Sequence, residues 1–291
     1  MQKFVGTGVA LITPFKEDLS VDFDALIKLV NYNIENGTDY LVINGTTGES
    51  ATITATEKQE IIDVIIKTNN NRLPLVLGVG GNNTATVIDE LKTRDFTGID
   101  GILSVAPYYS KPTQEGFYQH YKAIAEATDL PIILYNVPGR TARNMEPATT
   151  IRLANDFNNI VAVKEAGNNQ QQYYTLLKDK PANFLVISGD DDLALGTILA
   201  GGSGVISVIG QAFPKEFSAM INHGLQGNNK EGFEIHYKMM DIIDFIFEEN
   251  NPAGVKTVLQ ELNICSNNVR LPLVKASQEL TAKIVAFVAG F

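Results

Sequence analysis

The sequence predicts a closed (β/α)8 barrel, the TIM-barrel fold, with a C-terminal helical extension. Eight short apolar runs recur along the first two thirds of the 291 residues, helical segments separate most of them, and the sequence after Pro214 is helical throughout. Apolar Val, Ile and Leu runs are typical of parallel strands buried on both faces, which helical crossovers usually connect. We therefore predict a barrel over 1–225 and a helical region over 226–291.

The predicted strands end in polar or glycine residues, and in chain order they are 8–15, 40–47, 73–80, 101–107, 131–138, 159–166, 184–191 and 204–210. The first predicted helix starts at an Asp cap, Asp22, and ends at Gly37. The next helix begins with a capping-box spacing from Thr54 to Glu57. These signals place helices in the connections between strands.

The main alternative to a closed barrel is an open, doubly wound sheet. Eight consecutive units without a dinucleotide fingerprint favour closure. The glycine cluster at 200–204 precedes the eighth strand instead of following the first, so it matches a dinucleotide-binding loop poorly and indicates a tight turn. After Pro214, four helical segments follow at 214–225, 229–249, 251–262 and 280–290, and the last three form the predicted extension.

Composition excludes several functional classes. The chain is 44% hydrophobic and 19% charged, which suits a compact enzyme, and its net charge of −10 opposes binding to nucleic acid or anionic lipid. One cysteine, Cys265, cannot form an internal disulfide, and the three histidines lack zinc-ligand spacing. We expect no metal and no cofactor. No run reaches the roughly 18 apolar residues of a membrane span, and no cleavage site follows the first apolar run, so we expect a cytoplasmic protein.

Candidate site residues stand where each predicted strand turns polar, because active sites of such barrels lie at the C-terminal ends of the strands. These residues are Thr46, Thr47, Glu49, Tyr108, Tyr109, Tyr135, Asn136, Arg140, Lys164, Glu165, Gly189, Asp190 and Asp191. We expect them to meet at one end of the barrel.

Lys164 is unusual among them because it closes an otherwise apolar run, Asn-Ile-Val-Ala-Val-Lys. Strand alternation puts Ile160, Ala162 and Lys164 on one face, and an inward-facing Ala162 would leave room beneath the amine. Desolvation favours a neutral amine, the nucleophile that forms imines with carbonyl compounds. The alternative is a structural lysine paired with a neighbouring carboxylate.

The surrounding residue types favour imine chemistry. Hydroxyl groups of Tyr135 and Thr47 can relay protons, and Tyr109 can extend that relay. Arg140 can hold a carboxylated substrate through two parallel hydrogen bonds. Taken singly, each aromatic residue could instead pack in the core or at the rim, so the hypothesis depends on their convergence.

With these residues placed, the chain resembles the dihydrodipicolinate synthase family of the N-acetylneuraminate lyase superfamily over essentially its full length. The matching segments are Gly-Thr-Thr-Gly-Glu-Ser at 45–50, Ala-Pro-Tyr-Tyr-Ser-Lys-Pro at 106–112, Tyr-Asn-Val-Pro-Gly-Arg-Thr at 135–141, Val-Lys-Glu-Ala-Gly at 163–167, Ser-Gly-Asp-Asp at 188–191, Gly-Val-Ile-Ser-Val at 204–208 and Arg-Leu-Pro-Leu at 270–273. Together these motifs are highly specific.

The resemblance implies that Lys164 forms an imine with pyruvate, and that the enamine attacks the aldehyde of L-aspartate 4-semialdehyde, on the route to lysine and diaminopimelate. Thr47, Tyr109 and Tyr135 match the family's proton relay, in which Tyr109 reaches in from the neighbouring subunit. A homo-oligomer is thus implied, at least a dimer and usually a tetramer.

The same resemblance assigns substrate contacts. Thr46 and Thr47 match the contacts to the pyruvate carboxylate, and Arg140 matches the residue that holds the semialdehyde's carboxylate. Gly189 and Ile206 match positions that line the lysine's pocket through backbone groups.

The sequence departs from the family pattern at two places. Gly254 stands where proline is more usual, at a helix start. In relatives that lysine inhibits, a pocket binds the inhibitor, and four residues match it: Ser50, Ala51, Asn82 and Tyr108. Three others differ, because Ala55, Lys58 and Thr86 stand where histidine, histidine and glutamate are typical. Lys58 would repel the ligand's ammonium and Thr86 cannot attract it, so we predict weak or absent inhibition.

Four alternatives fit the same fold. A neuraminate lyase or 2-keto-3-deoxy sugar-acid aldolase would share the lysine and tyrosine, but Arg140 and the paired threonines favour the synthase. A noncatalytic barrel would lack a relay member, yet all are present. A phosphate-binding isomerase barrel would not explain why a lysine stands at position 164.

Overall fold

The computed structural model describes residues 2–291 and confirms the predicted fold. Eight parallel strands close into a barrel in chain order, β1 to β8, with β8 hydrogen-bonded to β1. The strands are β1 (Gly6–Ala10), β2 (Tyr40–Ile43), β3 (Leu75–Gly78), β4 (Gly101–Val105), β5 (Ile132–Asn136), β6 (Ile160–Glu165), β7 (Leu185–Ser188) and β8 (Gly204–Ser207). Each lies inside its predicted range except β1, which begins two residues earlier.

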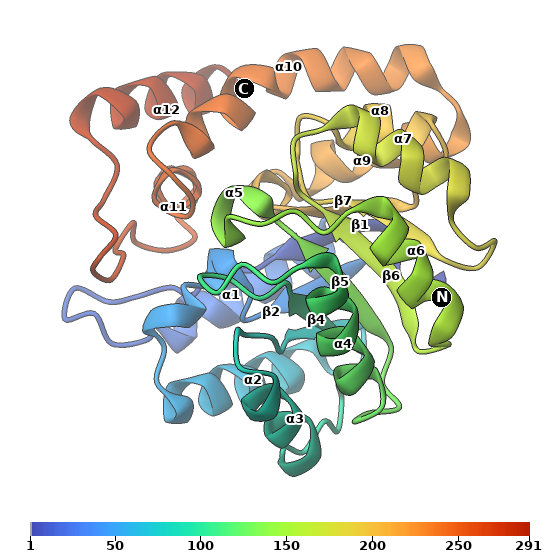
Figure 1. The fold of residues 1–291 in the computed structure, drawn as a ribbon. Coiled ribbons are helices and arrows are strands. Elements are labelled where there is room, and N and C mark those ends of the chain that lie inside the picture. Colours follow the sequence, from blue (N-terminus) through green and yellow to red (C-terminus); the bar gives the residue numbers. More distant parts are fainter. Residues whose placement is uncertain (1) are drawn as a thin grey trace.

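The helices form an outer layer around the strands (Figure 1). They are α1 (Phe23–Glu35), α2 (Ala55–Asn69), α3 (Thr84–Thr93), α4 (Gln114–Ala125), α5 (Pro138–Thr141), α6 (Pro147–Asp156), α7 (Gln170–Asp179), α8 (Ala194–Leu199) and α9 (Pro214–Gln226), followed by α10 (Asn229–Glu248), α11 (Ala253–Glu261) and α12 (Gln278–Gly290). Four short 3-10 turns complete the chain: η1 (Gln2–Phe4), η2 (Thr46–Gly48), η3 (Ser50–Thr52) and η4 (Ile209–Gln211).

The helix starts follow the predicted caps. Asp22 accepts a hydrogen bond from the Ala25 N–H at the start of α1, and Thr54 and Glu57 form the reciprocal capping box of α2. Such caps satisfy backbone donors that have no partner within the helix.

The core is split by the barrel wall into two layers. One apolar cluster fills the barrel interior with alternate strand residues, including Val42, Val76, Leu103 and Ile133. The intervening residues, such as Leu41 and Leu77, pack outward against the helices. This alternation follows from the two-residue period of a strand and explains the continuous apolar runs in the sequence.

Two details of the predicted strands were wrong. The first run ends as a strand at Ala10, because the next residues leave the ladder and the Ile12 N–H bonds the Gln211 side chain. On β6, the pairing shifts between Ile160 and Ala162, which is a β-bulge. Ile160 therefore packs in the outer layer while Ala162 lies in the interior, so the two do not share a face.

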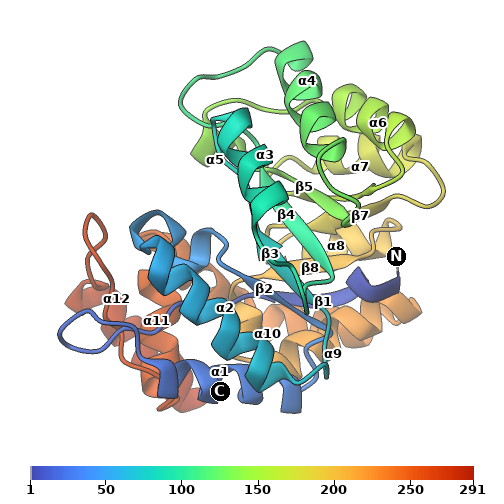
Figure 2. The ribbon, with the colours of Figure 1, turned by 90° about the horizontal axis from the view of Figure 1, so that it is seen from below.

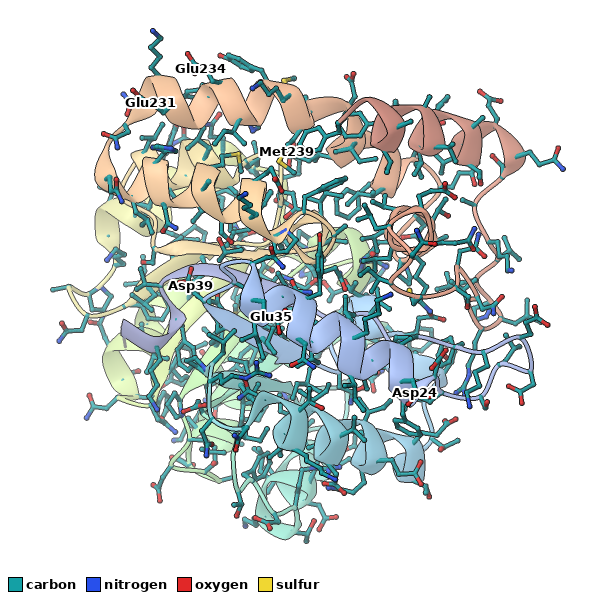
Figure 3. All side chains as sticks on the ribbon, turned by 180° about the vertical axis from the view of Figure 1, so that it is seen from behind. Asp24, Glu35, Asp39, Glu231, Glu234 and Met239 are labelled. Carbon is teal, nitrogen blue, oxygen red and sulfur yellow. The ribbon has the colours of Figure 1, made fainter. Side chains whose placement is uncertain are left out.

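The C-terminal helices lie to one side of the barrel and at one of its ends. Figures 1 and 2 both show α11 and α12 at the opposite end of the molecule from the N-terminus. Helix α10 packs on α8 and α9 and then contacts α11 and α12. Figure 3 shows Met239 on the side of α10 turned toward α9, whereas Glu231 and Glu234 lie at its outer edge. The division into two domains near residue 225 stays a prediction.

Candidate active site

A cavity of about 640 Å³ opens at the C-terminal ends of the strands. Its wall is built by the loops after β2, β5, β6, β7 and β8 and by the end of α10 with the turn that follows it. Most of the predicted site residues line it: Thr46, Thr47, Tyr135, Arg140, Lys164, Gly189, Asp190 and Asp191. Residues distant in sequence therefore meet where barrel geometry predicts an active site.

Lys164 lies near the end of β6 and is only 5% exposed. Its neighbours across the sheet are Tyr135 on β5 and Ile187 on β7. The Nζ atom is 4.4 Å from the centroid of the Tyr135 ring, and Ala162 of the interior cluster lies two residues before it on the same strand. The amine is thus buried beside the Tyr135 ring, with its tip at the cavity wall.

Gly189 leaves space for the lysine side chain. A Cβ at this position would stand 2.9 Å from Lys164 Cε and 2.6 Å from Ala166 Cβ, closer than side chains normally approach. Ile206 lies deeper, fully buried in β8 and in the interior cluster, and Val208 reaches the cavity in its place. Of these two predicted residues, only Gly189 lines the cavity.

The loop after β2 carries the two threonines on the short turn η2. Thr47 is buried, and its Oγ1 accepts a hydrogen bond of 2.8 Å from Asn251 Nδ2. The Gly48 carbonyl accepts one of 2.7 Å from the Thr13 hydroxyl. Glu49 follows in the left-handed region at φ +55 and forms a buried ion pair with Lys256. The turn is therefore fixed from both sides.

Arg140 lies on α5 at the exposed rim of the cavity. Its Nη2 donates a hydrogen bond of 3.0 Å to Asn250 Oδ1. No carboxylate lies within ion-pairing distance of this guanidinium in residues 2–291. Its remaining donors are available to an anionic substrate.

Tyr109 is the one predicted relay residue that this chain does not bring to its own cavity. It is 89% exposed, at φ +69, and lies outside the cavity lining. Its neighbour Tyr108 lines a second, adjoining cavity of about 450 Å³.

The second cavity contains most of the residues that the sequence assigns to a lysine pocket. Ser50, Ala51, Lys58 and Tyr108 line it, and Asn82 Nδ2 donates to the Tyr108 carbonyl over 3.3 Å. Lys58 Nζ lies 2.6 Å from Glu90 Oε1 on α3. This ion pair offsets part of the positive charge that we expected to repel a lysine ligand.

Buried carboxyl groups line the side of the cavity formed after β6 and β7. Burial raises the pKa of Asp191 to about 6, although N–H groups of Ile209 and Val208 and the charge of Lys164 oppose the rise. Burial likewise raises the pKa of Asp190. By accepting from the two N–H groups, Asp191 ties the loop after β8 to the one after β7. Across residues 2–291, no group of three His, Cys, Asp or Glu side chains is arranged to hold a metal ion.

Sequence reasoning missed Asn250 and Asn251, which contact Arg140 and Thr47 respectively. They lie in the turn between α10 and α11, far from any strand end. The only sequence signal was an Asn-Asn-Pro run that separates two helical patterns.

No helix in residues 2–291 has the length and apolar character needed to cross a membrane.

The fold and site define a class of (β/α)8 barrels in which a buried lysine lies at a strand end, at the wall of the cavity. The model of the dihydrodipicolinate synthetase family matches residues 3–290. A 4-hydroxy-tetrahydrodipicolinate synthase from Flavobacterium psychrophilum is 57% identical over 287 residues, covering 99% of this chain and 98% of that protein. The chain belongs to the dihydrodipicolinate synthase family, and this confirms the activity predicted from the sequence.

Solved structures agree with this assignment. Dihydrodipicolinate synthase from Aquifex aeolicus has a TM-score of 0.95 and 40% identity, with 99% of this chain and 98% of that chain covered. A second structure, described as the first monomeric dihydrodipicolinate synthase variant, has a TM-score of 0.96 and 38% identity, with 99% and 96% covered.

Proposed function

We propose that Lys164 is the residue that forms the imine in a condensation of pyruvate with L-aspartate 4-semialdehyde. The observation that carries this assignment is the position of Lys164, buried at a strand end with its amine at the cavity wall. Tyr135 and Thr47 lie around the same cavity, so a carbonyl carbon at Nζ would have hydroxyl groups within the same enclosure.

The reaction then proceeds through an imine, an enamine and a ring closure. Lys164 Nζ forms a bond to the pyruvate carbonyl carbon, and the resulting hydroxyl leaves as water after it receives a proton. Loss of a methyl proton gives the enamine, whose carbon attacks the aldehyde carbon while the aldehyde oxygen takes up a proton. The amine of the adduct finally attacks the imine carbon, closes the ring and releases Lys164. Thr47 and Tyr135, with Tyr109 of a neighbouring subunit, transfer these protons.

The substrate contacts follow the cavity wall. Thr46 and Thr47 hold the pyruvate carboxylate beside the lysine, and Arg140 at the rim holds the carboxylate of the semialdehyde. Gly189 and Ile206 shape the pocket of the lysine, Gly189 at its wall and Ile206 in the layer beneath. Arg140 is suited to this role because its guanidinium forms no ion pair within residues 2–291, and its only side-chain hydrogen bond there is to Asn250.

We also propose that the working enzyme is at least a dimer and assembles as a tetramer. The support is Tyr109, whose side chain is exposed at the end of the barrel that carries the cavity. A second subunit packed there would receive this tyrosine, and would offer its own in return, as a two-fold interface requires.

The test of Lys164 is covalent trapping. Incubation with pyruvate followed by borohydride reduction should fix a stable adduct, and peptide mapping should place it on Lys164. Lys164→Arg keeps the positive charge without an imine-forming amine and should give no adduct. An adduct on another lysine, or none in the wild type, would overturn the assignment, and a coupled assay with aspartate semialdehyde then checks the second substrate.

Feedback inhibition provides a separate prediction. Because Thr86 supplies no carboxylate for the ligand's ammonium and Lys58 is positive, lysine should inhibit turnover weakly or not at all. The ion pair of Lys58 with Glu90 reduces the repulsion between Lys58 and the ligand's ammonium group. Thr86→Glu should therefore raise the sensitivity to lysine more than Lys58→His does. Submillimolar inhibition of the wild type in a lysine titration would contradict the prediction.

A further inference from the structure

The turn between α10 and α11 places two asparagine side chains against the active-site residues. Asn251 Nδ2 lies 2.8 Å from Thr47 Oγ1, and Asn250 Oδ1 lies 3.0 Å from Arg140 Nη2. Both asparagines line the 640 Å³ cavity, and Asn251 also lines the adjoining one. A segment outside the eight β/α units therefore contacts the groups proposed for each substrate.

Asn251 fixes the direction in which Thr47 can give its proton. An amide nitrogen can only donate, so Thr47 Oγ1 accepts in this bond and keeps its own hydrogen for another acceptor. No other side-chain hydrogen bond of Thr47 occurs within residues 2–291. Asn251 is 5% exposed, and its Oδ1 is buried without a protein partner in the same part of the chain. The hydroxyl proton of Thr47 is thus free for transfer within the cavity.

Asn250 acts on the guanidinium at the rim. It adopts φ +82, a left-handed conformation that asparagine tolerates better than most residues. Its Oδ1 accepts from Arg140 Nη2 and also from the Asn251 N–H, over 2.9 Å. The same amide oxygen therefore links the orientation of Arg140 to the backbone that carries Asn251.

From this geometry we infer that Asn251 and Asn250 are positioning residues of the two half-reactions. Asn251 sets the polarity of the Thr47 hydroxyl for imine formation with pyruvate, and Asn250 orients Arg140 for the carboxylate of the second substrate. The inference rests on the proposed function, because it presupposes that Thr47 and Arg140 have these roles.

The first experiment separates polarity from packing at Asn251. Asn251→Asp has nearly the same shape, but an ionised carboxylate can only accept, so Thr47 would turn its proton toward it and away from the cavity. Trapping of the pyruvate imine should slow by about tenfold or more in Asn251→Asp and in Asn251→Ala, since each loses the donor. At lower pH the trapping rate of Asn251→Asp should recover relative to that of the wild type at the same pH, because a protonated carboxyl group is again a donor. The trapping rate of Asn251→Ala should not recover.

A double-mutant comparison tests the link to Thr47. In a Thr47→Val background there is no hydroxyl to orient, so Asn251→Asp should slow trapping no further. Wild-type rates in Asn251→Asp, or equal and pH-independent losses in both Asn251 variants, would overturn the polarity role. Unchanged thermal melting of Asn251→Asp would show that the loss does not come from unfolding.

The second experiment concerns Asn250. Asn250→Gly accepts the positive φ and removes only the side chain, so it should raise KM for the semialdehyde by about three- to tenfold and change pyruvate trapping by less than that. Asn263→Gly is the matched control, since Asn263 also has a positive φ and is exposed, but contacts neither Arg140 nor Thr47. Equal effects of the two glycine variants would overturn the role of Asn250. Failure of trapping in the wild type itself would instead overturn the proposed function.

Discussion

Glu165 follows Lys164 on β6 and faces a different environment. Its carboxyl oxygens accept hydrogen bonds from Asn136 Nδ2 and Gln172 Nε2 in a buried polar network behind the cavity. Burial raises the pKa of Glu165 from the ordinary 4.5 to about 7, against the lowering effect of the two amides. Between pH 4.5 and about 7 this group therefore keeps its proton in the folded protein after the unfolded chain has lost it.

This pKa predicts how stability depends on pH. Because the folded protein binds the extra proton between pH 4.5 and about 7, the free energy of unfolding should fall as pH rises through that window and level off above it. At about 1.4 kcal/mol for each pH unit, the loss amounts to about 3 kcal/mol. Glu165→Gln cannot titrate, so the stability difference between wild type and variant should change by that amount in urea unfolding at a series of pH values. A constant difference would contradict the prediction.

Lys164 could be predicted from the sequence because its signal is local. A charged residue that ends an apolar run can be recognised without knowing which residues surround it in the fold. Asn251 could not be found in that way. Its hydrogen bond to Thr47 joins residues 204 positions apart, and nothing local to an asparagine in a helix-to-helix turn specifies which hydroxyl it will meet. Asp191 stands between these cases, since its strand-end position was evident but its bonds to the loop after β8 were not.

The turn η2, which carries Thr46 and Thr47, is held in place by the C-terminal region. Lys256 on α11 is fully buried and donates to Glu49 and to the Asn268 carbonyl. The Arg270 N–H donates to the other oxygen of Glu49 over 2.9 Å, so this carboxylate connects the loop after β2 with both ends of the 256–270 segment. Burial lowers the pKa of Lys256, and the attraction of Glu49 opposes that change.

Removing one partner of this ion pair should be costly. Lys256→Met leaves Glu49 as a buried charge without its cation, and should lower the free energy of unfolding by about 3–5 kcal/mol. Adding Glu49→Gln in the same chain should recover part of the loss, because no unpaired charge remains. Lys283→Met is the control: it removes an exposed partner of Glu248 in an ion pair screened by water, and should cost far less than Lys256→Met. Denaturant unfolding of all four proteins checks the order, and equal losses in the two lysine variants would refute it.

The elements themselves were predictable to the extent that local patterns determine them. The apolar runs and the caps at Asp22 and Thr54 located the strands and two helix starts. The bulge on β6 was not predictable, because an added residue in a ladder depends on how β5 and β6 pair. The added residue does not interrupt the apolar run in the sequence. The apolar run from Leu11 onward is typical of a strand, but the ladder does not continue there. The Leu11 N–H donates to the Val42 carbonyl, and the Ile12 N–H donates to the Gln211 side chain.

One chain forms the fold but does not bring the three proposed relay residues to one cavity. Thr47 and Tyr135 line the cavity, whereas Tyr109 projects from the loop after β4 into solvent. The solved structure described as a monomeric variant has the same barrel fold, with a TM-score of 0.96. What a partner would add is a hydroxyl group, so assembly should affect activity more than it affects folding.

This expectation can be tested by mixing two inactive variants. Lys164→Ala has no imine-forming amine, and Tyr109→Phe lacks the relay hydroxyl, so each should have activity reduced by about 100-fold or more when pure. In a hybrid dimer, the site that contains Lys164 of the Tyr109→Phe subunit receives an intact Tyr109 from the other subunit, and its relay is complete. Subunit exchange should therefore restore up to about half of the sites in each hybrid. A mixture that stays inactive, although native mass spectrometry shows hybrids, would mean that Tyr109 serves its own chain or no relay at all.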